Sequence, residues 1–443
     1  MQHRFWLFII LVILQAGCAT KVPVNAPSGP EVRLVPGEQM RLDLASVQVR
    51  EYRGDRVRLT ARVANDNDYP NGKLPDAFRR WWHFELAGID PTEETKLEVE
   101  LTNVGYRDSI TPVVRFGEHG DYQRLAQTPE TKNGTVKFSV LVPAGETSVR
   151  LAKWYPYTLR EYHEILDQLR AHPLVEEQQI GNSVQGRPIL MHTITDSAVP
   201  LSGKQRVWIH SAVHPAENTA YQVHQGLLRW LLSSDQDARE LLRHTVFNVV
   251  LMANPDGQAL GNYRTNANGV NLEMQFTAPY QSTEPEVQAL TQKIEEYMGS
   301  AEAPGSNPIR LLLNIHSAHG GNGPFHFVHT GNYFVNGTGV TPAVRAEEKR
   351  WVSAYRKRSA FVNVGKDESS SFSRGRAFVE AMMNDRYSAT WLTPPTMAIT
   401  LEGTYERGPV EDVPNTPQDF RQSGKEMGYA IADFLGVSLP SEQ

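Results

Sequence analysis

Short runs of alternating apolar and polar residues, broken by turn residues, fill the chain from about residue 33 to residue 151. Alternation with a period of two is typical of strands that have one buried face. The runs that fit this pattern are VRLTARV, WWHFELAG, KLEVELTNV, TVKFSVLVPAG and TSVRLAKW. Several short strands at this spacing predict an antiparallel β-sandwich, which we place at residues 35–153.

The pattern changes after residues 154–157, where helical stripes begin to alternate with buried apolar runs. The predicted helices are LREYHEILDQLRAH, TAYQVHQGLLRWLL and PEVQALTQKIEEYM. The predicted strands are VWIHSAV, VFNVVLMANPDG, RLLLNIHSAHGG and TMAITLEGTY. This alternation predicts an α/β domain at residues 154–438 with a mixed, largely parallel sheet. Ligands of such domains bind beyond the carboxyl ends of the strands.

The first 34 residues have a different character. Arg4 precedes an apolar stretch at residues 5–14 and small residues before Cys18, which is the anatomy of a signal peptide at residues 1–17. LQAGC resembles the bacterial lipoprotein processing site, which implies that Cys18 is lipidated, and the alanine after it resembles the outer-membrane sorting pattern. Residues 18–34 then form a tether. We expect a lipid-anchored protein of the cell envelope that faces the periplasm; the alternative is an uncleaved N-terminal anchor.

The composition limits the partners and the metal ligands that this protein can use. The chain has 44 Lys and Arg against 50 Asp and Glu and no basic run, which argues against nucleic acid as a partner. Cys18 is the only cysteine, so the folded chain has no internal disulfide. A metal site would therefore use histidine and carboxylate ligands.

Three potential metal ligands stand at predicted strand ends. His214 and Glu217 follow VWIHSAV around the first turn of a helix, and His316 ends LLLNIH. Two histidines and a glutamate with one open position form the arrangement of zinc hydrolases, with a single Zn²⁺ ion. Taken alone, each residue has a plainer interpretation: His214 as a helix cap, His316 as a core or loop histidine.

Two further residues suit a catalytic role. Glu402 follows an apolar run in AITLEG and is a candidate general base. Arg264 in GNYRTN is a candidate to polarise a carbonyl and hold an oxyanion. The plain alternatives are an ion pair of Glu402 with Arg407 and a solvated loop arginine.

The order of these motifs adds to the argument. HPAE, NPDG, GNYR followed by GVNLE, NIHS and TLEG resemble the zinc carboxypeptidase family, in particular its cytosolic-carboxypeptidase-like branch, which carries a β-sandwich before the catalytic domain. RRWWHFELAG and WYPYT look like the linker region of that branch, and the resemblance spans roughly residues 35–435. It implies that His214, Glu217 and His316 bind zinc, that Glu402 is the general base, and that Arg264 stabilises the transition state.

One motif departs from the family. Where the family reads Gly-[Val/Ile]-Asp-Leu-Asn-Arg, this chain has GVNLEM. Asn271 replaces an aspartate that buttresses a zinc-binding histidine, and its side chain can still accept a hydrogen bond from an imidazole. Glu273 and Met274 replace the pair that holds the substrate's terminal carboxylate.

Three hypotheses follow for this substrate pocket. Arg374 or Arg376 in SFSRGRAF takes over the carboxylate; Glu273 recognises an amine, such as that of a cell-wall peptide; or the pocket binds without cleaving. The plain alternatives are solvated arginines and a solvent-facing Glu273.

The remaining candidates are aromatic. Tyr387 is a candidate for the family's mobile substrate-binding tyrosine, or else a packed core residue. We interpret His319, His326 and His329 as loop residues or residues around the metal ligands, and His210 as part of strand packing.

The sequence therefore predicts a zinc metallocarboxypeptidase that acts near the C-terminus of peptides, with cell-wall peptides as one candidate substrate. The rivals are a zinc amidase or deacylase and a non-catalytic envelope binding protein. A serine hydrolase is disfavoured because no Gly-x-Ser-x-Gly motif occurs.

Overall fold

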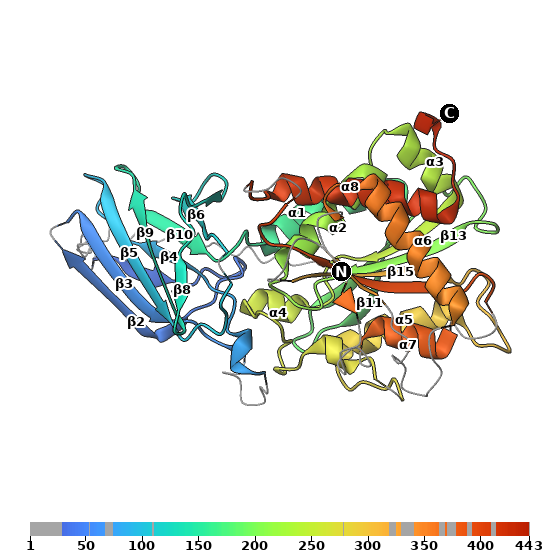
Figure 1. Ribbon diagram of the computed structural model, residues 1–443, viewed down its shortest axis with the longest axis horizontal. Coiled ribbons are helices and arrows are strands. Elements are labelled where there is room, and N and C mark those ends of the chain that lie inside the picture. The colour runs from blue at the N-terminus through green and yellow to red at the C-terminus, as the bar shows by residue number, and fades with distance from the viewer. Residues whose placement is uncertain are drawn as a thin grey trace, which may run out of the picture.

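The computed structural model describes residues 29–52, 54–66, 74–108, 110–277, 279–318, 325–328, 341–362, 368–369, 378–387, 392–408 and 413–442. Two bodies lie side by side in Figure 1, a β-sandwich in blue and blue-green and a larger α/β domain in green to red. Cys18 and the predicted signal peptide, and Arg374 and Arg376, lie outside the described residues. Within them, no helix is long and apolar enough to cross a membrane.

The sandwich consists of two five-stranded sheets. The first has the strand order β1 (Glu31–Arg33), β4 (His83–Ala87), β10 (Ser148–Ala152), β6 (Val113–Phe116) and β7 (Gln123–Arg124). The second has the order β2 (Asp43–Tyr52), β3 (Arg56–Arg62), β5 (Thr95–Thr102), β9 (Thr135–Val142) and β8 (Glu130–Lys132). Alternate side chains of both sheets share one buried core, which includes Leu59, Val99, Phe84 and Leu151.

The predicted sandwich is confirmed, with two differences. β3 and β5 pair in parallel along residues 56–62 and 96–102, whereas the other pairs of both sheets are antiparallel. β1 lies within residues 18–34, which we had assigned to the tether, because these residues add an edge strand to β4. The tether therefore ends earlier than predicted.

The α/β domain is built on one eight-stranded mixed sheet. Its order is β11 (Val175–Asn182), β12 (Pro188–Ile194), β14 (Thr245–Val250), β13 (Gln205–Ser211), β15 (Ile309–Ser317), β18 (Met397–Gly403), β16 (Phe325–Val328) and β17 (Glu368–Ser369). The central strands β14, β13, β15 and β18 run parallel, as predicted, and antiparallel strands flank them. The polar strand β11 at the edge had no clear sequence signal.

Helices cover both faces of this sheet (Figure 1). One face carries α1 (Leu159–Ala171), α2 (Asn218–Leu231), α3 (Gln236–His244), α6 (Pro342–Arg358) and α8 (Pro417–Leu435). The other carries α5 (Pro285–Met298) and α7 (Val379–Tyr387). Shorter turns are α4 (Pro255–Leu260) and the 3-10 helices η2 (Asp76–Phe78), η3 (Leu272–Gln275) and η6 (Pro440–Glu442).

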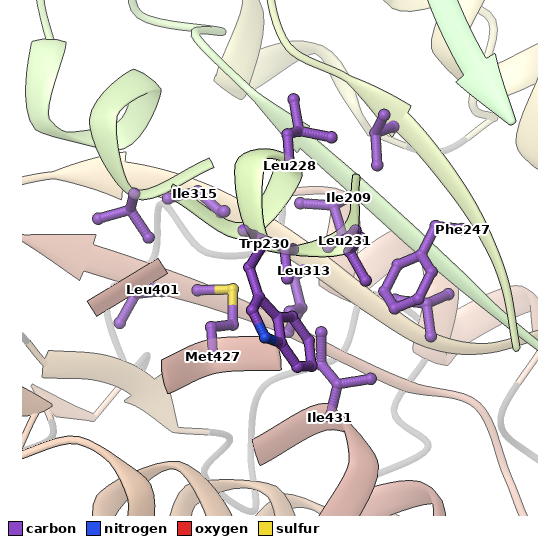
Figure 2. Packing of buried hydrophobic residues seen from close by; sticks show 14 of the residues in the cluster. Ile209, Leu228, Trp230, Leu231, Phe247, Leu313, Ile315, Leu401, Met427 and Ile431 are labelled. Atoms are coloured by element: carbon purple, nitrogen blue, oxygen red, sulfur yellow. The ribbon is translucent and has the colours of Figure 1, made fainter. Parts of the chain in front are cut away.

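The larger core fixes the position of the site. Figure 2 shows Ile209, Leu313 and Leu401 of the central strands packed toward Trp230 of α2 and Met427 of α8. Because successive side chains of a strand point to opposite faces, the residues between these apolar ones face the α5 and α7 side. On β15 and β18 those residues end in His316 and Glu402, which are paired in the strand register.

Candidate metal centre

One loop and one strand end bring three potential metal-ligating side chains together. β13 ends at Ser211, Ala212 adopts a left-handed φ of 61°, and the chain then passes His214 before α2 begins directly after Glu217. His316 comes from β15, the neighbouring strand. Ligand atoms of His214, Glu217 and His316 all lie within 4.8 Å of one another, and all three residues are buried.

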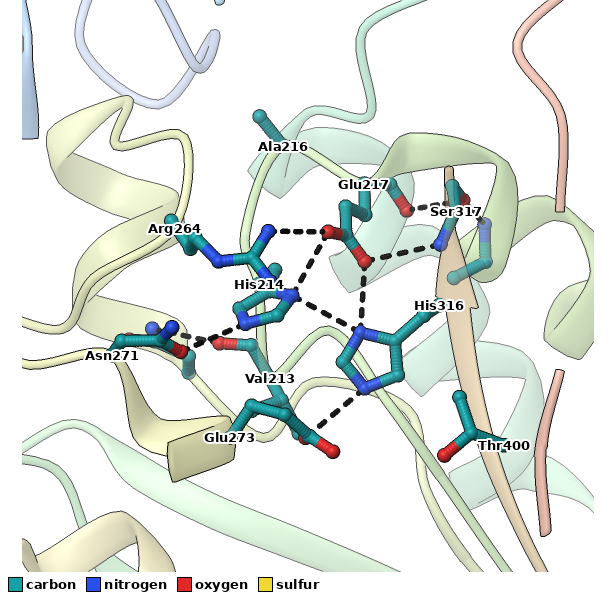
Figure 3. A network of polar contacts seen from close by, with 12 residues as sticks. Val213, His214, Ala216, Glu217, Arg264, Asn271, Glu273, His316, Ser317 and Thr400 are labelled. Carbon is teal, nitrogen blue, oxygen red and sulfur yellow. Dashed lines mark hydrogen bonds and ion pairs between the residues drawn. The ribbon is translucent and has the colours of Figure 1, made fainter. Parts of the chain in front are cut away.

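The glutamate carboxylate lies between the two imidazoles (Figure 3). Glu217 Oε1 is 2.9 Å from His214 Nδ1, and Oε2 is 2.8 Å from His316 Nδ1. Oε2 also accepts a hydrogen bond from the backbone N–H of Ser317 at 3.0 Å, which fixes the carboxylate relative to β15. The two Nδ1 atoms are 3.1 Å apart.

This arrangement fits a zinc ion. The Nε2 atom of each imidazole faces a protein acceptor, Asn271 Oδ1 at 2.9 Å for His214 and Glu273 Oε2 at 3.2 Å for His316. When Nε2 carries the proton on both rings, the Nδ1 lone pairs and the carboxylate converge on one point, where a cation would relieve their repulsion. Two nitrogens on one tetrahedral zinc would lie about 3.3 Å apart, close to the separation here.

The electrostatics favour a positive charge at the same point. Burial works to lower the pKa of His316, but the carboxylates of Glu273 and Glu217 together raise it well above its usual value. Burial opposes ionisation of Glu217, yet His214 and His316 hold its pKa well below its usual value. Two buried carboxylates beside one ring thus favour positive charge at this point, which a bound metal cation would supply.

Glu402 and Arg264 flank this cluster. Desolvation and the nearby charge of Glu217 raise the pKa of Glu402 to about 8. The guanidinium of Arg264, 18% exposed, donates to Glu217 Oε1 at 3.3 Å, and its Cζ lies 4.6 Å from the ring centre of Phe78. An acid–base group and a cation therefore border the same ligands.

The β-sandwich holds the loop that carries Arg264, a feature that the sequence did not reveal. The carboxylate of Asp66 accepts hydrogen bonds from the backbone N–H groups of Tyr263, Arg264 and Thr265 at 3.0, 2.6 and 2.8 Å. Asp66 lies about 200 positions away in the chain, so no local pattern links the two segments.

Tyr387 and the remaining candidate histidines do not belong to the described cluster of metal-ligating side chains. Tyr387 is 2% exposed within the core formed with α5, so the packed-core interpretation holds and its assignment to the substrate pocket is not supported. His210 is buried and accepts a hydrogen bond from Trp208, in line with strand packing. His319 and His329 lie outside the described residues, and only the backbone of His326 is described, in β16.

Glu273 is not turned to solvent, because its side chain is 2% exposed. Asn271 Oδ1 lies 2.9 Å from His214 Nε2, so Asn271 contacts His214 as the sequence predicted. Asn314 and Thr400 are polar neighbours that sequence reasoning missed. Their signal was the two-residue spacing before His316 and Glu402, which places each pair on one strand face.

Comparison with known proteins gives consistent results. Residues 162–333 match the zinc carboxypeptidase family. Human cytosolic carboxypeptidase 6 is 25% identical over 380 residues, 82% of this chain and 72% of the human protein. Mouse cytosolic carboxypeptidase 6 is 29% identical over 232 residues, 49% of this chain, and the aligned part spans only 43% of the mouse protein.

Solved structures share the whole architecture, sandwich included. A metallo-carboxypeptidase from Burkholderia cenocepacia superposes with a TM-score of 0.72 at 19% identity, over 92% of this chain and 99% of that one. A metallo-carboxypeptidase from Pseudomonas aeruginosa in complex with (2-guanidinoethylmercapto)succinic acid gives 0.71 at 21% identity and the same coverage. At these identities the likeness concerns the fold.

Proposed function

We propose that the protein is a zinc-dependent metallocarboxypeptidase that hydrolyses peptide bonds near the C-terminus of peptides, because residues 162–333 match the zinc carboxypeptidase family. The observation that carries this proposal is the convergence of His214, Glu217 and His316, with Glu402 in register with His316. His214, Glu217 and His316 would hold one Zn²⁺. The ion would supply Lewis-acid activation of water and of the scissile carbonyl.

The residues around the metal then have distinct tasks. Glu402 takes the proton from the attacking water and returns it to the leaving amine, for which a raised pKa is suited. Arg264 donates to the carbonyl oxygen as negative charge develops on it. Asp66, through three backbone N–H groups, keeps Arg264 in place.

The substrate and location are proposed from the sequence. A lipid anchor at Cys18 would place the enzyme in the cell envelope, where cell-wall peptides are available substrates. Arg374 or Arg376 is the proposed partner of the terminal carboxylate, because the residue after Glu273 is Met274 rather than arginine.

The test is a cleavage assay on purified protein loaded with zinc. Wild type is incubated with free-ended peptides, C-terminally amidated peptides and cell-wall stem peptides, and mass spectrometry identifies the products. We expect loss of C-terminal residues. Glu402→Gln should slow the cleavage about 10²–10⁴-fold and leave the zinc content unchanged.

Glu406→Gln is the matched control, because Glu406 lies four residues after Glu402 in the chain. Its carboxylate accepts a hydrogen bond from the backbone N–H of Thr111. The amide oxygen of glutamine can accept the same hydrogen bond. This variant should cleave like the wild type. Cleavage of amidated substrates alone would favour an amidase. No cleavage by a fully zinc-loaded protein would overturn the proposal in favour of a binding protein.

A further inference from the structure

The two imidazoles of the metal centre are held by chemically different partners. His214 Nε2 faces the side-chain oxygen of Asn271, whereas His316 Nε2 faces the carboxylate of Glu273 (Figure 3). An amide oxygen carries no net charge and a carboxylate carries a full one. The group that contacts Nε2 of His316 is therefore negatively charged, whereas the group that contacts Nε2 of His214 is neutral.

Glu273 is fixed in this position from its other side as well. Its Oε1 accepts a hydrogen bond from Asn314 Nδ2 at 3.1 Å, and Asn314 lies two residues before His316 on the same face of β15. Asn314 Nδ2 also donates to Thr400 Oγ1 at 3.1 Å, which ties the carboxylate to β18. If Glu273 swung away, Asn314 would lose a hydrogen-bond acceptor and His316 would lose its ion-pair contact 3.2 Å away.

We propose that Glu273 is the positioning residue that orients His316 for the metal and supplies the compensating charge, while Asn271 orients His214 without adding charge. The inference rests on the proposed function, since it concerns the zinc of that same site. Glu217 and Glu273 together supply two negative charges beside the cation. A carboxylate behind a ligating imidazole raises the basicity of that ligand and its hold on the metal.

This assignment changes the interpretation of the GVNLEM segment. Oε1 of Glu273 accepts a hydrogen bond from Asn314, and Oε2 lies 3.2 Å from His316 Nε2, so the carboxylate is directed at the metal ligand rather than at an amine of the substrate. The replacement of Asn-Arg by Glu273 and Met274 is instead a change around the metal, and it leaves the terminal carboxylate to another part of the chain.

Zinc affinity of the full chain tests this, measured by competition with a chromogenic chelator. Glu273→Gln keeps the shape and removes the charge, and it should weaken zinc binding about 10–100-fold. Adding Asn271→Asp to that variant moves the charge behind His214 and should restore most of the affinity. The absorption spectrum of bound Co²⁺ should also shift in Glu273→Gln, because the orientation of His316 relative to the metal changes.

Glu380→Gln is the matched control. Glu380 is also a buried carboxylate of this polar chain, and it accepts a hydrogen bond from Thr400, one contact further from His316 than Glu273. It should bind zinc within about threefold of wild type, because only a carboxylate that contacts a ligand acts on the metal.

Each outcome decides a different claim. A folded Glu273→Gln with wild-type zinc affinity would overturn the assignment and leave the proposed function intact. Wild type that binds zinc but cleaves no peptide would overturn the proposed function and leave the assignment standing. If Glu273→Gln does not fold, the single variant Asn271→Asp decides. Zinc binding about tenfold tighter than in the wild type would support the claim that a carboxylate behind a ligating histidine strengthens zinc binding. Unchanged zinc affinity would contradict that claim.

Discussion

At the scale of single residues, buried histidines serve in two ways. His214 and His316 belong to the candidate metal centre, whereas His83 and His224 are fully buried outside it. Burial lowers the pKa of His83 and of His224 to about 3, with Arg150 adding to the effect at His83. Ser211 Oγ, which lies 2.9 Å from His224 Nδ1, also donates to the carbonyl of Leu251, so it stays paired if His224 is replaced.

The lowered pKa values of His83 and His224 predict that the folded protein loses stability as the pH falls. An unfolded histidine titrates near pH 6.5, so between about pH 3 and pH 6.5 the unfolded chain binds more protons and the free energy of unfolding falls as the pH falls. His224→Leu should remove about 2 kcal/mol of the loss between about pH 7 and pH 5. Urea unfolding at both pH values measures this.

The control for that experiment is His244→Gln, since the side chain of His244 is 53% exposed on α3. It should lose the same stability on acidification as the wild type. An equal loss in His224→Leu would show that His224 does not contribute to the acid sensitivity.

At the scale of elements, α2 matters most because Glu217 lies at its first turn. α2 packs against α8 so closely that glycine is required on both helices. A Cβ at Gly226 would lie 1.9 Å from the carbonyl oxygen of Arg421, and a Cβ at Gly424 would lie 1.9 Å from that of Val223. The position of a metal ligand thus depends on a contact with the last long helix of the chain.

Gly424→Ala tests this contact. Alanine favours a helix over glycine by about 1 kcal/mol, yet here the overpacking should lower the free energy of unfolding by about 1–3 kcal/mol. Gln422→Ala, on the exposed side of α8, is the control and should change stability by less than about 0.5 kcal/mol. Thermal unfolding of both variants decides; a stabilised Gly424→Ala would contradict the close contact.

The helices and strands differ in how well they could be predicted from the sequence. Strands with clean alternation or an unbroken apolar run, such as β9 and β15, and amphipathic helices such as α1 were predictable from local pattern. The polar edge strand β11 and the glycine-bearing helix α8 were not, because tertiary contacts stabilise them. The candidate metal ligands were indicated by their motifs, but the roles of Asp66 and Asn314 and the buried position of Glu273 depend on long-range contacts.

At the scale of the whole molecule, the β-sandwich and the segment directly after it contact the loop between His214 and Glu217. Gln39 of the sandwich donates from its side-chain amide to the carbonyl of Pro215 at 2.7 Å, and Trp154, two residues after β10, donates to that of Ala216 at 2.9 Å. Both acceptors lie between His214 and Glu217. Together with Asp66 on the Arg264 loop, these contacts support a bracing role for the sandwich.

Asp66→Asn measures how much that bracing contributes to catalysis. An amide turned toward three N–H donors cannot accept from all of them, so Arg264 should shift and kcat/KM should fall at least about tenfold, with zinc affinity unchanged. Asp90→Asn is the control, since Asp90 holds only the local Thr92 turn of the sandwich. An active Asp66→Asn would mean that the sandwich does not position Arg264.

The most direct test of the account is a zinc titration of metal-free protein in which bound zinc and released C-terminal residues are measured in the same samples. We predict that both rise together and level off at one zinc per chain. His316→Ala should show neither binding at this site nor cleavage. Peptide cleavage before zinc is added, or full activity of His316→Ala, would contradict the account.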